Sequence, residues 1–197
     1  MSERQQRLLY LSSPDRGLDV ILEHFWPAIH EQVPEALFSF AYAPVYQQIA
    51  EQDPMVGAHA ARIRELSDQP GVTPLGSLSQ PQVARILRKS LVLALPSYNT
   101  THGQPFCETS CIIAAEAQAA GCLVVASGWG ALPETVQVGR LVDGPALSDR
   151  WRDAFIAEIV DGLTNPDTQA WAQAEGPEHA RTLGWQGVGV QVAGLIR

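Results

Sequence analysis

Two glutamates separated by seven residues stand within residues 106–121, whose sequence is FCETSCIIAAEAQAAG. The pattern predicts a turn and a helix, followed by a buried strand in the apolar run at residues 122–126. Eight residues of helix would place Glu116 roughly 12 Å along the axis from Glu108 and about 80° around it. Both carboxylates would then face one extended ligand from two positions.

The backbone between the two glutamates adds a second binding feature. We expect Thr109, Ser110 and Cys111 in the first helical turn, where free N–H groups and the positive end of the helix dipole favour a diphosphate. This span matches a nucleoside diphosphate sugar, with Glu108 on sugar hydroxyls, the N–H groups on the phosphates and Glu116 on the ribose.

The alternative is that both glutamates lie on the solvent-exposed face of an amphipathic helix. The neighbours of Glu116 favour the functional interpretation, because small apolar residues predict close packing, in which an unpaired charge is costly. These neighbours are Ile112, Ile113, Ala114, Ala115, Ala117, Ala119 and Ala120.

The segment resembles the E-x7-E donor-site motif of retaining glycosyltransferases of the GT-B architecture, especially family 4, the glycosyl transferases group 1. Residues 12–17 (SSPDRG) are similar to that family's first phosphate loop, and residues 128–134 (GWGALPE) to its glycine-rich loop. The resemblance runs from about residue 8 to the C-terminus and covers only the donor-binding half of such an enzyme. It therefore implies that the acceptor-binding half is absent.

The resemblance also assigns roles around the first phosphate loop. It implies that Arg16 and Gly17 contact the donor diphosphate. The family usually has a second basic residue several positions earlier, where this chain has Ser12 and Ser13. The alternative for Arg16 is an exposed arginine in the first turn of the following helix.

Further expectations concern the sugar and the base. The resemblance implies that Gly128 and Gly130 bring backbone groups against the donor sugar, and that the base lies near the end of the strand at residues 71–76. Trp129 is either a stacking surface or a packed aromatic residue. His102, in the loop 96–105, is either a contact to the sugar or a solvated loop histidine.

The composition limits the class of protein. A chain of 197 residues suits one α/β domain, and 46% hydrophobic with 17% charged residues is ordinary for a globular protein. The net charge of −8 argues against a general nucleic-acid surface. We see no signal peptide and no apolar run long enough to cross a membrane.

Three cysteines lie close together in the sequence, at Cys107, Cys111 and Cys122. They have no zinc-site spacing, and we interpret them as reduced, small apolar residues of a cytoplasmic protein in preference to a redox group. The sequence contains no P-loop signature, no G-x-G-x-x-G motif and no carboxylate cluster that demands a metal. We therefore expect no metal and no cofactor beyond the nucleotide sugar.

The elements that must position these residues alternate between strands and helices. This alternation predicts an α/β fold, a Rossmann-like doubly wound parallel sheet of about six strands flanked by helices. Pro27 is expected to bend or interrupt the first helix, and residues 45–69 to form one irregular helix or two. The expected strands are residues 7–12, 37–42, 71–76, 91–95, 123–126 and 140–143.

Three hypotheses remain open from the sequence. The first is that residues 1–197 are the single donor-binding domain of a hexosyltransferase, with Glu108 as the candidate catalytic residue, inactive until an acceptor-binding domain or subunit joins it. The second is a stand-alone nucleotide-sugar-binding subunit or relic without turnover. The third is a flavodoxin-like or other Rossmann-type domain, which predicts no dependence of ligand binding on Glu116.

Overall fold

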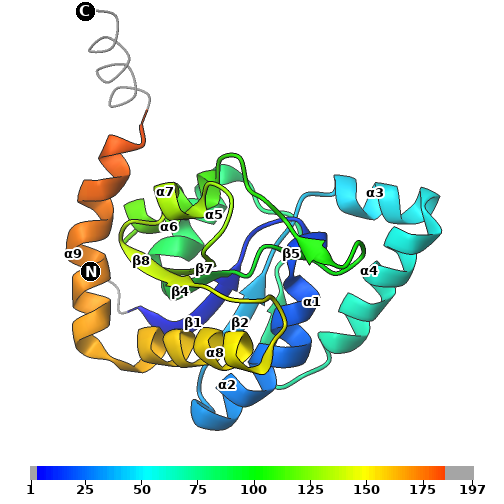
Figure 1. The fold of residues 1–197 in the computed structure, drawn as a ribbon, viewed down its shortest axis with the longest axis horizontal. Helices are drawn as coiled ribbons and strands as arrows, with labels where there is room; N and C mark the ends of the chain where they lie inside the picture. Colours follow the sequence, from blue (N-terminus) through cyan, green and yellow to red (C-terminus); the bar gives the residue numbers. More distant parts are fainter. Residues whose placement is uncertain (1–3, 185–197) are drawn as a thin grey trace, which may run out of the picture.

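A six-stranded parallel sheet runs through the centre of the fold (Figure 1). The structure is a computed structural model and describes residues 4–184. The strand order is β3-β2-β1-β4-β7-β8, and every neighbouring pair is parallel. The predicted doubly wound sheet is thereby confirmed. Its strands are β1 (Gln5–Tyr10), β2 (Leu37–Phe40), β3 (Val72–Pro74), β4 (Ser90–Leu95), β7 (Leu123–Ser127) and β8 (Gly139–Val142).

The central strands are apolar along their length because both faces of the sheet are covered. Leu8 and Val92 belong to the hydrophobic core on one face, whereas the next residues, Leu9 and Leu93, belong to a second core on the other. This alternation follows from the two-residue repeat of a strand.

Helices pack on both faces and at the edges of the sheet (Figure 1). One core contains side chains of α1 (Leu18–Val20), α2 (Trp26–Gln32) and α8 (Asp149–Thr164). The other contains side chains of α5 (Gln80–Arg88), α6 (Ile112–Ala119) and α7 (Leu132–Thr135). The remaining helices are α3 (Val45–Gln52), α4 (Pro54–Leu66) and α9 (Pro166–Thr182), of which α9 packs against α6.

Pro27 changes the first helix without stopping it. A π-helical turn, Ile21–Phe25, joins α1 to α2, and the N–H of Trp26 bonds to the carbonyl of Ile21 five residues back. Pro27 has no N–H to donate to a carbonyl four residues back, and the wider turn accommodates that loss.

In other segments the structure adds detail to the helices and loops that were expected from the sequence. Residues 45–69 form two helices, because the Asp53 side chain accepts hydrogen bonds from Met55 and Val56 and caps α4. The loop 96–105 contains a short antiparallel pair that was not predicted, β5 (Tyr98–Asn99) with β6 (Gln104–Pro105). The sequence pattern of residues 185–196 also predicts a helix, and these residues lie outside the described ones. No described helix is long and apolar enough to span a membrane.

The order of the strands determines where a ligand can bind. From β1 the chain proceeds outward through β2 and β3, and it then returns to place β4 on the other side of β1. At such a switch point the loops that follow the two central strands diverge and leave a crevice at the carboxyl edge of the sheet. The loop after β1 contains Arg16, and the loop after β4 contains Glu108.

Candidate functional site

The loop after β1 is held in a shape that requires glycine. A 3₁₀ turn, Pro14–Arg16, follows the strand, and Gly17 then adopts a φ of 109°. A Cβ at Gly17 would lie 2.7 Å from Cγ of Pro96, so both the backbone angle and the space exclude other residues. The hydroxyl of Tyr10 donates to the carbonyl of Ser13 at 2.6 Å and fixes the start of the turn.

Arg16 and Glu108 meet across the switch point. Nη1 of Arg16 donates to Oε1 of Glu108 at 3.3 Å, and the guanidinium stacks on the ring of Phe106, 4.0 Å from its centroid. Nε of Arg16 is buried and has no partner among the described residues. The side chain as a whole is one-third exposed, and its one side-chain hydrogen bond among the described residues is that to Glu108, so the accessible part of the guanidinium keeps donor capacity that a phosphate oxygen can use.

The carboxylate of Glu108 is largely buried, with 8% of the residue exposed. Burial raises the pKa of Glu108 above its ordinary value, and the charge and hydrogen bond of Arg16 oppose that rise. Glu108 is thus a hydrogen-bond acceptor in a poorly solvated position, and the cation beside it favours its ionised form.

The glycine-rich loop packs directly on the backbone of Glu108. The N–H of Ala131 donates to the carbonyl of Glu108 at 2.7 Å. Gly130 has a φ of 63°, and a Cβ there would lie 2.7 Å from the Glu108 nitrogen. Gly128 is confined from another side, because its Cβ would overlap the carboxylate of Asp143. The structure thus places Gly130 against the backbone of Glu108, whereas Gly128 lies against Asp143, the residue that follows β8.

The expected start of the helix after Glu108 is wrong. Helix α6 begins at Ile112, and Thr109, Ser110 and Cys111 precede it. The reason is a long-range contact, since the carbonyl of Glu108 is bonded to Ala131 and is not available to a helix. The helix-based separation of the two glutamates therefore does not apply.

The expected burial of Glu116 is also wrong, because Glu116 is exposed on α6. Its apolar neighbours Ala114 and Ala117 point into the core instead. Glu116 lies at the side of a cleft of about 350 Å³. The remaining walls of the cleft come from the segments after β1, β2 and β3, and include Leu11, residues 41–44, Ser77, Leu78 and Gln80.

The predicted site residues thus fall into two adjoining groups. Arg16, Glu108 and Gly130 form one group at the switch point. Glu116 belongs to the cleft along the carboxyl edge of the sheet, and α6 connects the two because Ile112 and Ile113, at its start, line the same cleft.

The structure also bears on the open alternatives. Trp129 stacks on Trp151 at 6.0 Å between centroids and donates from Nε1 to the carbonyl of Ser97 at 3.1 Å, so it is a packed aromatic residue. His102 is exposed and lines a different hollow from Glu116. Burial raises the pKa of the Cys111 thiol to about 11, which disfavours the reactive thiolate.

A buried polar network next to the Arg16 loop was missed from the sequence. Nε2 of His59, on α4, lies 3.2 Å from Oδ2 of Asp19, and the hydroxyl of Tyr46 contacts the other ring nitrogen. Burial alone would raise the pKa of Asp19, but hydrogen bonds from His59 and Thr100 outweigh it and leave that pKa below its ordinary value. The network ties the helix that follows Arg16 to α3 and α4. Asp19 and His59 are 40 residues apart in the sequence, so no local sequence signal reveals their contact.

We expect His59→Ala to lower the free energy of unfolding by about 1–3 kcal/mol at pH 7, because the buried Asp19 carboxylate loses a hydrogen-bond donor. Urea denaturation measures the change. His102→Ala, at an exposed histidine, is the control and should change stability by less than about 0.5 kcal/mol. Equal midpoints for both variants would show that the network does not contribute to stability.

Comparison with known proteins identifies the class of this fold and then the family. The structural neighbours are GT-B glycosyltransferases, and the chain has the fold of one Rossmann-like half of that architecture. The family model described as glycosyl transferases group 1 matches residues 5–165. The chain belongs to this family, which argues against the flavodoxin-like alternative.

Two relatives and two solved structures show the extent of the similarity. D-inositol 3-phosphate glycosyltransferase of Corynebacterium glutamicum is 29% identical over 190 residues, which cover 95% of this chain and 37% of the relative. The Mycolicibacterium smegmatis enzyme of the same name is 36% identical over 124 residues, or 61% of this chain and 25% of that one. Sucrose-phosphate synthase of Thermosynechococcus elongatus has a TM-score of 0.70 at 21% identity and covers all of this chain and 45% of its own. Anabaena HepE, solved with UDP and glucose, has a TM-score of 0.63 at 18% identity, covering 96% of this chain and 49% of that one. The chain therefore spans less than half the length of these proteins.

Proposed function

We propose that residues 1–197 form the donor-binding domain of a retaining hexosyltransferase and bind a nucleoside diphosphate sugar. The observation that carries this proposal is the ion pair of Arg16 and Glu108 at the switch point, next to a cleft that contains Glu116. In a member of this family, that arrangement offers one place for each part of the donor.

The nucleoside fits the cleft along the carboxyl edge of the sheet. Its volume of about 350 Å³ falls within the range of small-molecule sites. The segment from Ser77 to Gln80 borders the part of the cleft beyond β3, where the base would lie. The exposed carboxylate of Glu116 would accept hydrogen bonds from the ribose hydroxyls.

The diphosphate would bind where α6 begins. The N–H groups of Ile112 and Ile113 donate to no protein acceptor among the described residues, as expected for a first helical turn. The N–H groups of Thr109, Ser110 and Cys111, which precede the helix, likewise donate to no protein acceptor among the described residues and stay candidates for this contact. Arg16 would pair with the distal phosphate and stabilise the charge that develops on the leaving group.

The sugar would lie against Glu108 and the glycine-rich loop. Glu108 would accept hydrogen bonds from sugar hydroxyls, and backbone groups near Gly130 would line the opposite side. A UDP-hexose is the first donor to test, because HepE was solved with UDP and glucose. The acceptor site would belong to a second domain or subunit, and the absence of a metal or further cofactor stays a prediction.

Two matched substitutions test this division of roles. Glu116→Gln should weaken UDP binding roughly tenfold, since each charge-assisted hydrogen bond contributes about 1.5 kcal/mol or more. Glu108→Gln should leave UDP affinity unchanged and weaken UDP-glucose binding to a similar extent. Isothermal titration calorimetry measures both affinities.

The control is Glu175→Gln, which removes an exposed carboxylate from α9 without touching the site. It should bind both ligands as the wild type does. Unchanged UDP affinity in Glu116→Gln would remove Glu116 from the ribose site. Equal loss of both ligands in Glu108→Gln would contradict the assignment of Glu108 to the sugar.

A further inference from the structure

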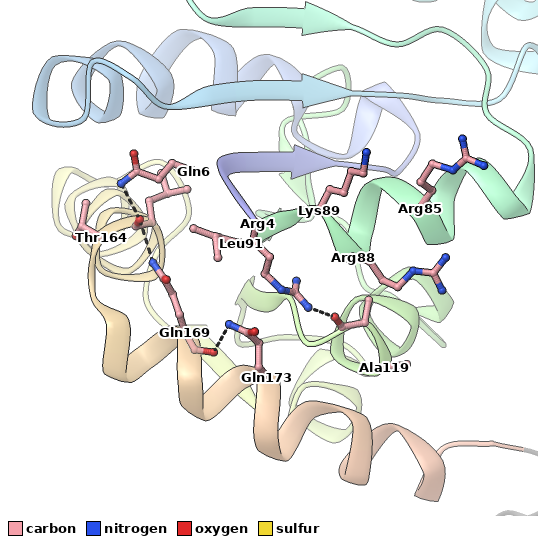
Figure 2. A pocket seen from close by; sticks show the side chains of 12 residues that line it. Arg4, Gln6, Arg85, Arg88, Lys89, Leu91, Ala119, Thr164, Gln169 and Gln173 are labelled. Carbon is pink, nitrogen blue, oxygen red and sulfur yellow. Dashed lines mark hydrogen bonds between the residues drawn. The ribbon is translucent and has the colours of Figure 1, made fainter. Parts of the chain in front are cut away.

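A second and larger hollow lies at the opposite edge of the sheet, where β1 and β4 begin (Figure 2). Its volume is about 780 Å³, within the range of small-molecule sites. The ends of α5, α6 and α8 and the first half of α9 form its walls. Strands of this length span roughly 15–20 Å, and the hollow shares no lining residue with the cleft that contains Glu116. A smaller pocket, lined by Gln80, Arg88 and Glu116 among others, adjoins both.

The charges around this hollow are all of one sign. Arg4, Arg85, Arg88 and Lys89 line it, and no carboxylate does so among the described residues. The chain has 21 acidic and only 13 basic residues, so four cations without a carboxylate are a strong local departure from its net charge of −8. The side chains of Arg85, Arg88 and Lys89 are exposed and donate to no protein group among the described residues.

The central cation, Arg4, has a different task from the other three. Its guanidinium donates to the carbonyls of Ser90, at 2.8 Å, and of Ala120. These bonds satisfy backbone acceptors at the start of β4 and just after α6, acceptors that would otherwise repel an anion. The three remaining cations make no such bonds among the described residues and are exposed around the hollow.

The other end of the hollow is neutral and rich in acceptors. The amide nitrogens of Gln6 and Gln169 donate to the carbonyl of Leu163 at 3.2 and 3.1 Å, and that of Gln173 donates to Gln169 at 3.1 Å. These bonds use the amide N–H groups, so the side-chain oxygens remain free to accept bonds from hydroxyls. Figure 2 shows the glutamines and Thr164 on one side, the cations of α5 on the other, and Arg4 between them.

We propose that this hollow binds a small phosphorylated polyol, such as a sugar phosphate, at a site distinct from the donor site. The phosphate would lie against Arg85, Arg88 and Lys89, since exposed cations at a concave surface favour a doubly charged anion. The hydroxyls would lie against Gln173 and its neighbours. A competing explanation is that the cations only complement the dipole at the end of α5, which would require no ligand.

Calorimetric binding to the 197-residue chain tests the proposal, with glucose 6-phosphate, inorganic phosphate and glucose as probes. Glucose 6-phosphate should bind more tightly than the other two, and saturating UDP should not displace it. The double substitution Arg85→Gln/Arg88→Gln should weaken its binding at least tenfold. Gln173→Ala should weaken binding of glucose 6-phosphate and leave binding of inorganic phosphate unchanged.

The matched control is Arg64→Gln/Arg150→Gln, which removes two exposed arginines from α4 and α8 and should keep wild-type affinity. An equal loss in the control would reduce the effect to net charge. Displacement by UDP would move the ligand to the donor site. No binding at millimolar concentration, or binding only to phosphatidylserine vesicles that the double substitution abolishes, would overturn the proposal in favour of the helix dipole or a membrane surface.

Discussion

The 197 residues on their own should bind a nucleotide sugar and transfer it to no acceptor at a useful rate. The described residues supply candidate contacts for base, ribose, phosphates and sugar around one cleft and one ion pair. Transfer also requires an acceptor hydroxyl held beside the anomeric carbon, and such positioning accounts for roughly 7–11 kcal/mol of a barrier. We therefore expect slow hydrolysis at most.

An end-point assay with labelled UDP-glucose measures this, with binding by calorimetry in parallel. Addition of an acceptor-binding half, as a separate chain or fused at the N-terminus, should produce transfer with retention at the anomeric carbon. Inversion would contradict the proposed retaining mechanism. Acceptor-dependent turnover by the lone chain as a monomer would contradict the half-enzyme proposal.

The fold was predictable because its signals are local. The apolar runs at residues 91–95 and 123–126 are continuous since β4 and β7 are covered on both faces. In α8 the buried residues Trp151, Phe155, Ile159 and Leu163 recur at helical spacing. Such patterns require no knowledge of the rest of the chain.

The site was only partly predictable because its details depend on distant contacts. The positions of Arg16 and Glu108 after two strands were readable, and the structure brings their side chains together. The start of α6 was not readable, because the bond between Glu108 and Ala131 joins residues that are far apart in the sequence. For Glu116, the sequence shows that its neighbours are apolar, but it does not show that their side chains point into the core while that of Glu116 is exposed.

Arg16→Ala should have a double effect, because Arg16 faces both the proposed phosphate and Glu108. Affinity for UDP should fall at least tenfold and affinity for UMP much less, since the lost contacts are charge-assisted bonds to the distal phosphate. Calorimetry with the two nucleotides measures the difference. Equal losses would mean that Arg16 does not touch the distal phosphate.

The same substitution leaves the buried Glu108 carboxylate without its cation. Burial, which already raises the pKa of Glu108, then acts unopposed, so this pKa should rise further. A carboxyl group whose pKa is raised in the folded state destabilises that state once the pH exceeds the pKa that the same group has in the unfolded chain. The free energy of unfolding of the variant should therefore be about 1–3 kcal/mol lower than that of the wild type at pH 8, and the difference should be smaller at pH 5. The loss is expected to be smaller than the 3–5 kcal/mol for breaking a fully buried ion pair, because Arg16 is one-third exposed.

Urea denaturation at both pH values measures this loss, and Arg16→Ala/Glu108→Gln separates charge from packing. The double variant has no carboxylate at this position, so it should recover most of the lost stability and lose the pH dependence, while UDP affinity stays low. If the double variant were as unstable as Arg16→Ala, the lost contact with the Phe106 ring would be the cause. Recovery would show that Arg16 keeps Glu108 ionised in a position where burial alone favours its neutral form.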